Sequence, residues 1–175
     1  MLLQDAIKLI DHPLLRNKKP GVWADLGCGQ GLFTNALAQV IAPESRIYAV
    51  DKEDSVFDIP ISMPPVCIEK ITADFVKDNL PFNDLDGILM ANSLHFVKDK
   101  TAFLKKIQGY FASKKTFLFI EYDMDSANPW VPYPVSFKSL EQLAKSSGYG
   151  SPIKIYELPS RYNRSNIYSA IAQSE

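Results

Sequence analysis

Residues 22–31 read Val-Trp-Ala-Asp-Leu-Gly-Cys-Gly-Gln-Gly, and this stretch decides the fold. The run from Val22 to Leu26 is short and mostly apolar, which is typical of a buried strand. Three glycines follow within five residues, and residues 32–41 then carry apolar side chains at helical spacing. Glycine has no Cβ, so it permits a tight turn and a close approach of the main chain to a ligand. The stretch therefore predicts a strand, a ligand-binding turn and a helix in succession.

The same alternation continues along the chain. Short apolar runs predict further strands at 46–50, 66–72, 85–90, 116–122, 153–158 and 167–172. Apolar residues at helical spacing predict further helices at 2–10, 98–111 and 136–147. Three prolines interrupt residues 55–65, so we expect any helix there to be short or absent.

The order of these elements indicates the fold class. Strands that alternate with helices favour an α/β fold, with a doubly wound, mostly parallel sheet and helices on both faces. The last two strands are joined only by residues 159–166. Parallel neighbours need a crossover of about a dozen residues or more, so we expect an antiparallel hairpin at the C-terminal end.

Length and composition narrow the class of protein. The 175 residues favour one domain, 1–175, in which residues 1–19 form an N-terminal helical extension. The formal net charge is −1 and no long basic block occurs, so we do not expect a nucleic-acid partner. No apolar stretch approaches 18 residues and the start lacks the pattern of a signal peptide, so we expect a cytoplasmic protein without a membrane span. The sequence does not indicate an oligomeric state.

The two cysteines, Cys28 and Cys67, are too few for a disulfide framework or a zinc site, and we expect no metal. We interpret Cys28 as a small filler of the turn and Cys67 as a core residue.

A carboxylate follows the second predicted strand. Asp51 lies 20 residues beyond Gly31, where an acid can accept hydrogen bonds from both ribose hydroxyls of an adenosine ligand. This acid suits both NAD and S-adenosylmethionine (SAM). A dinucleotide fingerprint, Gly-x-Gly-x-x-Gly, would place its third glycine at position 32, which is leucine. The spacing thus argues against an NAD-dependent oxidoreductase, which stays an alternative.

Polar and aromatic residues follow the later strands at the same edge of the sheet. After the third strand, Asp74 can accept from an adenine amino group and Phe75 can lie beside the purine. After the fourth strand, Asn92 stands where the methionyl part of SAM would lie. His95, three residues on, is our candidate to orient or deprotonate a substrate. The positions after the fifth strand that are candidates for a substrate wall or lid are Tyr122, Asp123, Trp130 and Tyr133.

Together these positions resemble the class I SAM-dependent methyltransferases, and the resemblance extends from about Pro20 to the C-terminus. The family pattern of an acid followed by Gly-x-Gly-x-Gly matches Asp25, Gly27, Gly29 and Gly31. The ribose-binding acid matches Asp51, the adenine-contacting acid matches Asp74, and the motif after the fourth strand matches residues 91–95. The resemblance implies a Rossmann-like, seven-stranded sheet whose seventh strand is antiparallel.

The resemblance also implies a function. It is closest to small, single-domain members that use SAM to methylate small molecules, so we expect a small-molecule acceptor that the sequence does not identify. Members that methylate amino groups of bases or glutamines carry Asn/Asp-Pro-Pro-Tyr/Phe, whereas residues 92–95 here read Asn-Ser-Leu-His. A non-catalytic, SAM-binding regulatory protein is the alternative from another class.

Overall fold

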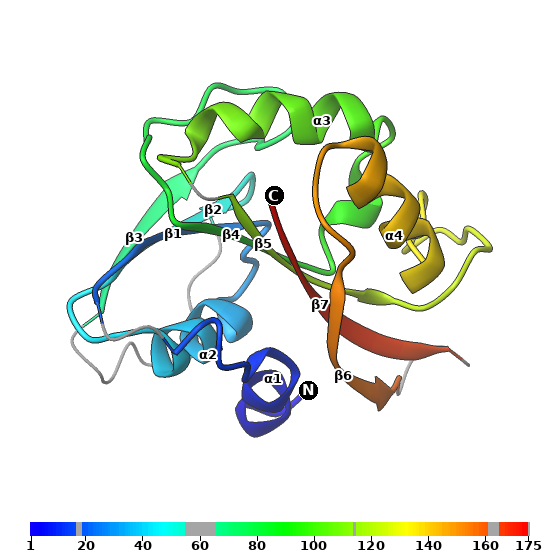
Figure 1. The fold of residues 1–175 in the computed structure, drawn as a ribbon, viewed down its shortest axis with the longest axis horizontal. Coiled ribbons are helices and arrows are strands. Elements are labelled where there is room, and N and C mark those ends of the chain that lie inside the picture. Colours follow the sequence, from blue (N-terminus) through cyan, green and yellow to red (C-terminus); the bar gives the residue numbers. More distant parts are fainter. Residues whose placement is uncertain (17–18, 55–65, 114, 161–164, 175) are drawn as a thin grey trace.

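A seven-stranded sheet forms the centre of the computed structural model, which describes residues 1–16, 19–54, 66–113, 115–160 and 165–174 (Figure 1). The strand order is β3-β2-β1-β4-β5-β7-β6. The strands are β1 (Val22–Leu26), β2 (Arg46–Asp51), β3 (Cys67–Thr72), β4 (Gly87–Ala91), β5 (Thr116–Tyr122), β6 (Ile153–Pro159) and β7 (Asn166–Gln173).

Strand direction agrees with the sequence-based expectation. The pairs β1–β2, β1–β4, β2–β3 and β4–β5 are all parallel. Strand β7 is antiparallel to both β5 and β6, so the predicted C-terminal hairpin is confirmed. The chain order reverses between β1 and β4, and in open α/β sheets ligands bind in the crevice beyond the carboxyl ends of the strands at such a reversal.

Helices cover both faces of the sheet (Figure 1). Helices α1 (Leu3–Ile10) and α2 (Leu32–Val40) lie on one face, and α3 (Lys100–Ile107) and α4 (Phe137–Ser146) lie on the other. The alternation of side chains along β5 shows both layers, because Phe117 and Phe119 join the apolar cluster under α3 and α4. Leu118 and Ile120 join the cluster under α1 and α2. The sheet is therefore buried on both sides.

Local sequence sets the helix ends. The Asp99 side chain accepts a hydrogen bond from the Ala102 amide at 2.9 Å, so α3 begins after it at Lys100. The predicted helix 98–111 is too long, because α3 ends at Ile107 and a 3₁₀ turn over Gln108–Tyr110 follows, which contains a helix-weakening glycine. The expectation for residues 55–65 lies outside the described residues.

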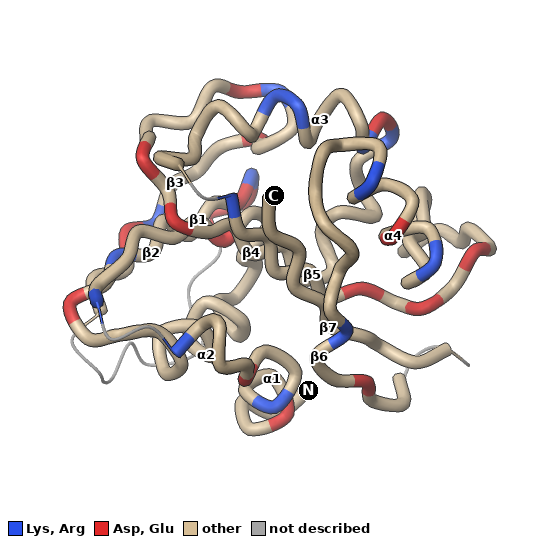
Figure 2. The backbone as a smooth tube through the Cα atoms, viewed as in Figure 1, with Lys and Arg blue, Asp and Glu red and all other residues tan. Residues whose placement is uncertain are grey.

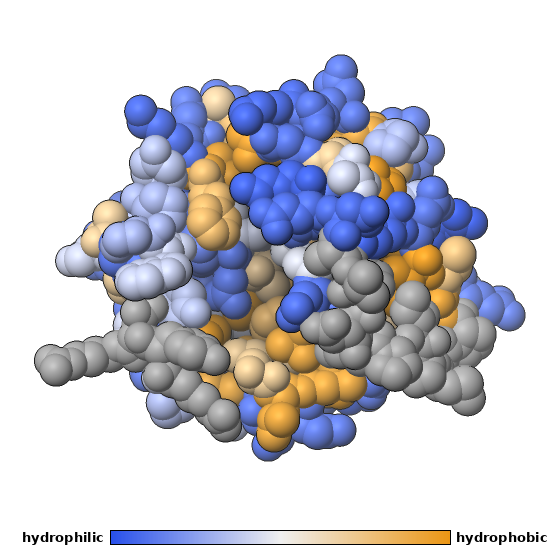
Figure 3. Space-filling view, turned by 180° about the vertical axis from the view of Figure 1, so that it is seen from behind, coloured by the Kyte–Doolittle hydropathy of each residue, from blue (hydrophilic) through white to orange (hydrophobic). Residues whose placement is uncertain are grey.

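The N-terminal helix packs closely on the rest of the chain. Ala6, Leu9 and Ile10 are fully buried in the cluster that α2 also enters. Met1 and Leu2, by contrast, are exposed. The space-filling view from behind shows hydrophobic surface across its lower part, at the level of the molecule where α1 lies (Figure 3). Helix α1 thus supports one face of the sheet and leaves apolar groups at its beginning accessible.

Charged positions of both signs are spread over the described chain (Figure 2). None of the described helices is long and apolar enough to cross a membrane. One expectation about the core is wrong: Cys67 is exposed, because β3 is an edge strand whose side chains are only partly covered.

Candidate active site

The glycine turn after β1 lies at the carboxyl edge of the sheet. Gly27, Gly29 and Gly31 have φ values of 84°, 51° and 84°, all in the left-handed region. The amides of Gly27 and Cys28 both donate to the Val50 carbonyl, at 2.8 and 3.0 Å. These bonds fasten the turn to the end of β2, next to the start of α2.

Two of the glycines are required for different reasons. A Cβ on Gly27 would lie 2.5 Å from Cβ of Ser93 and 3.4 Å from the Phe75 ring, so this position is filled by packing. A Cβ on Gly29 would meet no atom of the described residues within 4 Å. The described residues therefore leave space there for a ligand to approach the main chain.

Asp51 lies directly beside that space. Its Oδ2 accepts from the Gly29 amide at 2.8 Å, and its Oδ1 accepts from the Glu53 amide at 3.1 Å. A carboxylate oxygen can accept two hydrogen bonds, so each oxygen keeps capacity for a further donor. The structure thus brings together the turn and the carboxylate that the sequence placed 20 residues apart.

Asp25 is buried beneath the turn, at 1% exposure. Its Oδ2 accepts from the Thr34 hydroxyl at 2.6 Å, whereas Oδ1 has no hydrogen-bond partner among the described residues. Burial raises the pKa of this carboxyl to about 7, the Thr34 hydrogen bond opposes the rise, and the nearby Asp51 charge adds to it. A donor placed next to Oδ1 would satisfy a buried oxygen and favour its ionised form.

Asp74 is engaged in the turn that it begins. Its Oδ1 accepts from the amides of Val76 and Lys77 at 3.0 and 3.3 Å, and its Oδ2 lies 3.1 Å from Lys77 Nζ. Partial burial acts to raise the pKa of Asp74, but the hydrogen bonds from Lys77 and from both amides outweigh it and lower the pKa. Adjacent Phe75 packs edge-on against Phe103 at 5.8 Å. Adenine binding by Asp74 and Phe75 stays a prediction.

A pocket of about 490 Å³ opens at the same edge of the sheet, and we call it the strand-end pocket. It is mostly apolar, and its described lining residues are Met1, Asp5, Leu32, Phe33, Asn92, Tyr122, Leu158, Pro159, Ser160 and Ile167. These residues come from the beginnings of α1 and α2, from the ends of β4, β5 and β6, and from the start of β7. Because β7 is antiparallel, its start lies at the edge where the parallel strands end.

Asn92 links the strand end to this pocket. Its backbone has a φ of 52°, and its amide donates to the Ile120 carbonyl at 2.8 Å. The side-chain Oδ1 is buried and has no partner within the described part of the chain. Two buried oxygens, on Asn92 and Asp25, thus lack a hydrogen-bond donor among the described residues, and Asn92 is the one of the two that lines the pocket.

His95 forms a buried pair with Glu121, a residue that the sequence analysis missed. His95 is 2% exposed and Glu121 is 0% exposed. The His95 Nδ1 lies 2.6 Å from Glu121 Oε2, and the His95 amide donates to Oε1 at 3.2 Å. The sequence could have indicated this pair, because Glu121 is a charged residue inside the predicted buried strand 116–122 and therefore needs a buried partner.

The four residues expected to form a substrate wall lie in different places. Tyr122 lines the strand-end pocket, and its ring centre is 6.3 Å from that of His95. Asp123 instead accepts from the Phe137 amide at 2.8 Å and lies 3.7 Å from Lys154 Nζ. Trp130 is 78% exposed, and the ring of Tyr133 lies under Lys100 Nζ, so neither lines the pocket.

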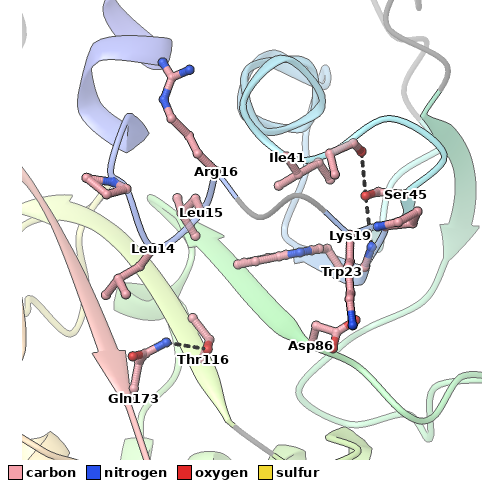
Figure 4. A pocket seen from close by; sticks show the side chains of 14 residues that line it. Leu14, Leu15, Arg16, Lys19, Trp23, Ile41, Ser45, Asp86, Thr116 and Gln173 are labelled. Atoms are coloured by element: carbon pink, nitrogen blue, oxygen red, sulfur yellow. Dashed lines mark hydrogen bonds between the residues drawn. The ribbon is translucent and has the colours of Figure 1, made fainter.

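A larger cavity, of about 670 Å³, lies at the opposite edge of the sheet (Figure 4). Gly21, Asp86 and Thr116, which line it, stand before or at the beginnings of parallel strands. Ligands of open α/β sheets bind beyond the carboxyl ends, where the glycine turn and Asp51 meet. Position and chemistry therefore make the strand-end edge the candidate site, although the cavity there is the smaller of the two.

Comparisons with known proteins identify the family of the chain. The family model described as a methyltransferase domain matches residues 24–119, which is more than half of the chain. A comparison with curated proteins finds no match.

Several solved structures share the fold. A 1,6-didemethyltoxoflavin-N1-methyltransferase of Burkholderia thailandensis, with S-adenosylhomocysteine (SAH) bound, is 18% identical with a TM-score of 0.73, over 98% of this chain and 77% of that one. A SAM-dependent methyltransferase of Aquifex aeolicus is 16% identical with a TM-score of 0.65, over all of both chains. A magnesium protoporphyrin IX methyltransferase of Synechocystis PCC 6803, with SAM bound, is 13% identical with a TM-score of 0.60, over 91% of this chain and 72% of that one.

The family match includes most of β1, the glycine turn and the carboxylate whose geometry is described above, and the fold is similar to that of these enzymes over at least 91% of the chain. The chain therefore belongs to the class I SAM-dependent methyltransferase family.

Proposed function

We propose that this SAM-dependent methyltransferase transfers a methyl group to a small molecule bound in the strand-end pocket. The observation that carries the proposal is the contact between the glycine turn and the Asp51 carboxylate, whose Oδ2 accepts from the Gly29 amide at 2.8 Å at the carboxyl edge of the sheet. A pocket of about 490 Å³ at the same edge is within the size range of small-molecule sites.

The described residues fit SAM as the methyl donor. Asp51 would accept from the ribose hydroxyls, and Asp74 and Phe75 would border the adenine. The unpartnered oxygens of Asp25 and Asn92 would accept from the ammonium of the methionyl group. When bound, SAM supplies an activated methyl group on a positively charged sulfur.

The chain itself mainly orients the two reactants. Correct orientation can contribute roughly 7–11 kcal/mol to lowering a barrier, so no strong acid or base is required by default. His95 would hold a proton from the acceptor where the acceptor must lose one. Glu121 occupies the His95 Nδ1 side at 2.6 Å, which fixes the ring and leaves Nε2 for that proton.

Titration of purified protein, freed of carried-over nucleoside, tests donor binding. Calorimetry with SAM and SAH should show binding, and NADH should show none, because the glycine spacing does not match a dinucleotide fingerprint. Asp51→Ala should weaken SAH binding at least about tenfold, since two charge-assisted hydrogen bonds are lost. The matched control is Glu141→Gln, an exposed acid on α4, which should leave SAH affinity unchanged.

Turnover separates the enzyme from a regulatory SAM-binding protein. SAH should accumulate when SAM is supplied together with a panel of small-molecule acceptors. Absence of any heat or thermal shift with SAM and SAH would overturn the proposal as a whole. Tight SAM binding without SAH formation from any acceptor would instead favour the regulatory protein.

A further inference from the structure

A single carboxylate stands in the wall of the strand-end pocket. Asp5, on the first turn of α1, is the one charged side chain among the described residues that line it. It is partly buried, and no hydrogen bond or ion pair joins its side chain to any described residue. The wall around it is mostly apolar, although Asn92, Tyr122 and Ser160 also line it, and a carboxylate that a ligand shields from water there needs a partner on that ligand.

Helix stabilisation does not explain this placement. An acid in the first turn of a helix interacts favourably with the helix dipole, by roughly 0.3–1 kcal/mol when it is exposed to solvent. That gain is available on the solvent side of α1, and Gln4, next to Asp5, is exposed there. Asp5 instead lies partly buried in the wall of the pocket, so the side of the helix on which it lies points to a ligand.

The chemistry of the wall then selects the ligand. An ionised carboxylate only accepts hydrogen bonds, and its strongest partners are cationic donors. The remaining lining residues, such as Leu32, Phe33 and Leu158, suit an apolar body. We infer, on the basis of the proposed function, that the methyl acceptor is a largely apolar molecule with one protonated amine, and that Asp5 binds this ammonium group.

The pocket adjoins the donor site, because Asn92 lines it and also follows β4 at the glycine-turn edge. A molecule bound against Asp5 in this pocket therefore lies next to the methyl donor that Asn92 contacts. Helix α1 is thus a specificity element as well as a support for the sheet, and Asp5 is its selective residue.

Three indole compounds test this inference, because they share one body and differ in charge. They are tryptamine, which carries an ammonium, tryptophol, which is neutral, and indole-3-propionate, which is an anion. Calorimetry on the full chain saturated with SAH should show tryptamine binding at least about tenfold more tightly than tryptophol, as expected for a charged hydrogen bond. Indole-3-propionate should bind most weakly, because like charges repel.

Asp5→Asn should lower tryptamine affinity to that of tryptophol and leave SAH affinity unchanged. The control Glu141→Gln, far from the pocket on α4, should alter neither affinity. Equal affinities for tryptamine and tryptophol in the wild type, or no binding of any of the three compounds, would overturn the inference. A loss of SAH affinity in Asp5→Asn would also overturn it, because Asp5 would then belong to the donor site.

Saturation with SAH is measured first, so the two proposals fail separately. Failure of SAH to bind the wild-type chain removes the proposed function. Normal SAH binding without an ammonium preference removes only the assignment of Asp5.

Discussion

At the scale of single residues, the glycine turn separates a packing requirement from a binding requirement. Gly27 lies against Ser93 and has no room for a Cβ, whereas no described residue lies within 4 Å of the position that a Cβ on Gly29 would take. Both have positive φ, so both resist substitution by other residues. The two glycines therefore differ in whether neighbouring residues leave space for a side chain.

We expect Gly27→Ala and Gly29→Ala to affect different properties. Gly27→Ala combines left-handed strain with a 2.5 Å clash and should lower the free energy of unfolding by roughly 2–4 kcal/mol. Gly29→Ala carries only the strain, roughly 1–2 kcal/mol, but should abolish most SAH binding because the methyl group fills the ligand space. Urea denaturation and calorimetry measure the two effects. Equal losses of stability in both variants would contradict this reading of the turn.

The residues that sequence patterns identified are those with a local signature. The glycine spacing and the strand-end position marked Gly29 and Asp51 in advance, and the structure places them in contact. Asp5 and Thr34 were not identified, because their roles depend on helices packing beside distant strands. Trp130 was expected near the substrate on its position after a strand alone; it is 78% exposed, and its contact with a substrate stays a prediction.

At the scale of elements, β5 and the 3₁₀ turn after β4 (η1, Leu94–Phe96) are joined by Glu121 and His95. Strand 116–122 was predicted with its observed bounds, because all of its residues except Thr116 and Glu121 are apolar or aromatic. The helix predicted at 98–111 was too long. The prediction followed the spacing of apolar residues, which takes no account of Gly109, and this glycine weakens a helix at that point.

Removing either member of the buried pair should have distinct effects. Glu121→Ala leaves the His95 ring without its partner and should lower the free energy of unfolding by roughly 3–5 kcal/mol, whereas Glu121→Gln keeps an acceptor and should cost less. His95→Ala should lower the rate at which SAH forms in the presence of an acceptor more than it lowers the affinity for SAH. Denaturation curves, rate measurements and calorimetry check these outcomes. A turnover rate that His95→Ala leaves unaltered would remove its role in proton transfer.

At the scale of the whole molecule, the sheet joins two apolar layers into one fold. Alternating side chains of β5 enter both layers, so stability is shared across the sheet. The sequence predicted this layered order because strands and helices alternate clearly. It could not predict the pocket, whose wall combines the first residues of the chain with residues near 160.

Stability should also depend on pH through Asp25. Its pKa is raised to about 7 in the folded chain from 3.8, so the folded state binds more protons than the unfolded state between these values. The stability of the ligand-free protein therefore falls as pH rises through this window. Relative to Asp25→Asn, the wild type should lose roughly 2–3 kcal/mol of unfolding free energy between about pH 5 and pH 8. Urea denaturation at both pH values checks this, and parallel pH profiles for the two proteins would contradict it.

The strand-end pocket draws most of its described lining from the two ends of the chain, in α1 and near the β6–β7 hairpin. The residues assigned to SAM lie between them, within residues 25–92. Substitutions that favour a new acceptor can therefore occur in the terminal segments, while the residues that bind SAM stay unchanged. Exchange of these terminal segments between related chains should therefore change which acceptor is methylated and keep the residues that bind SAM.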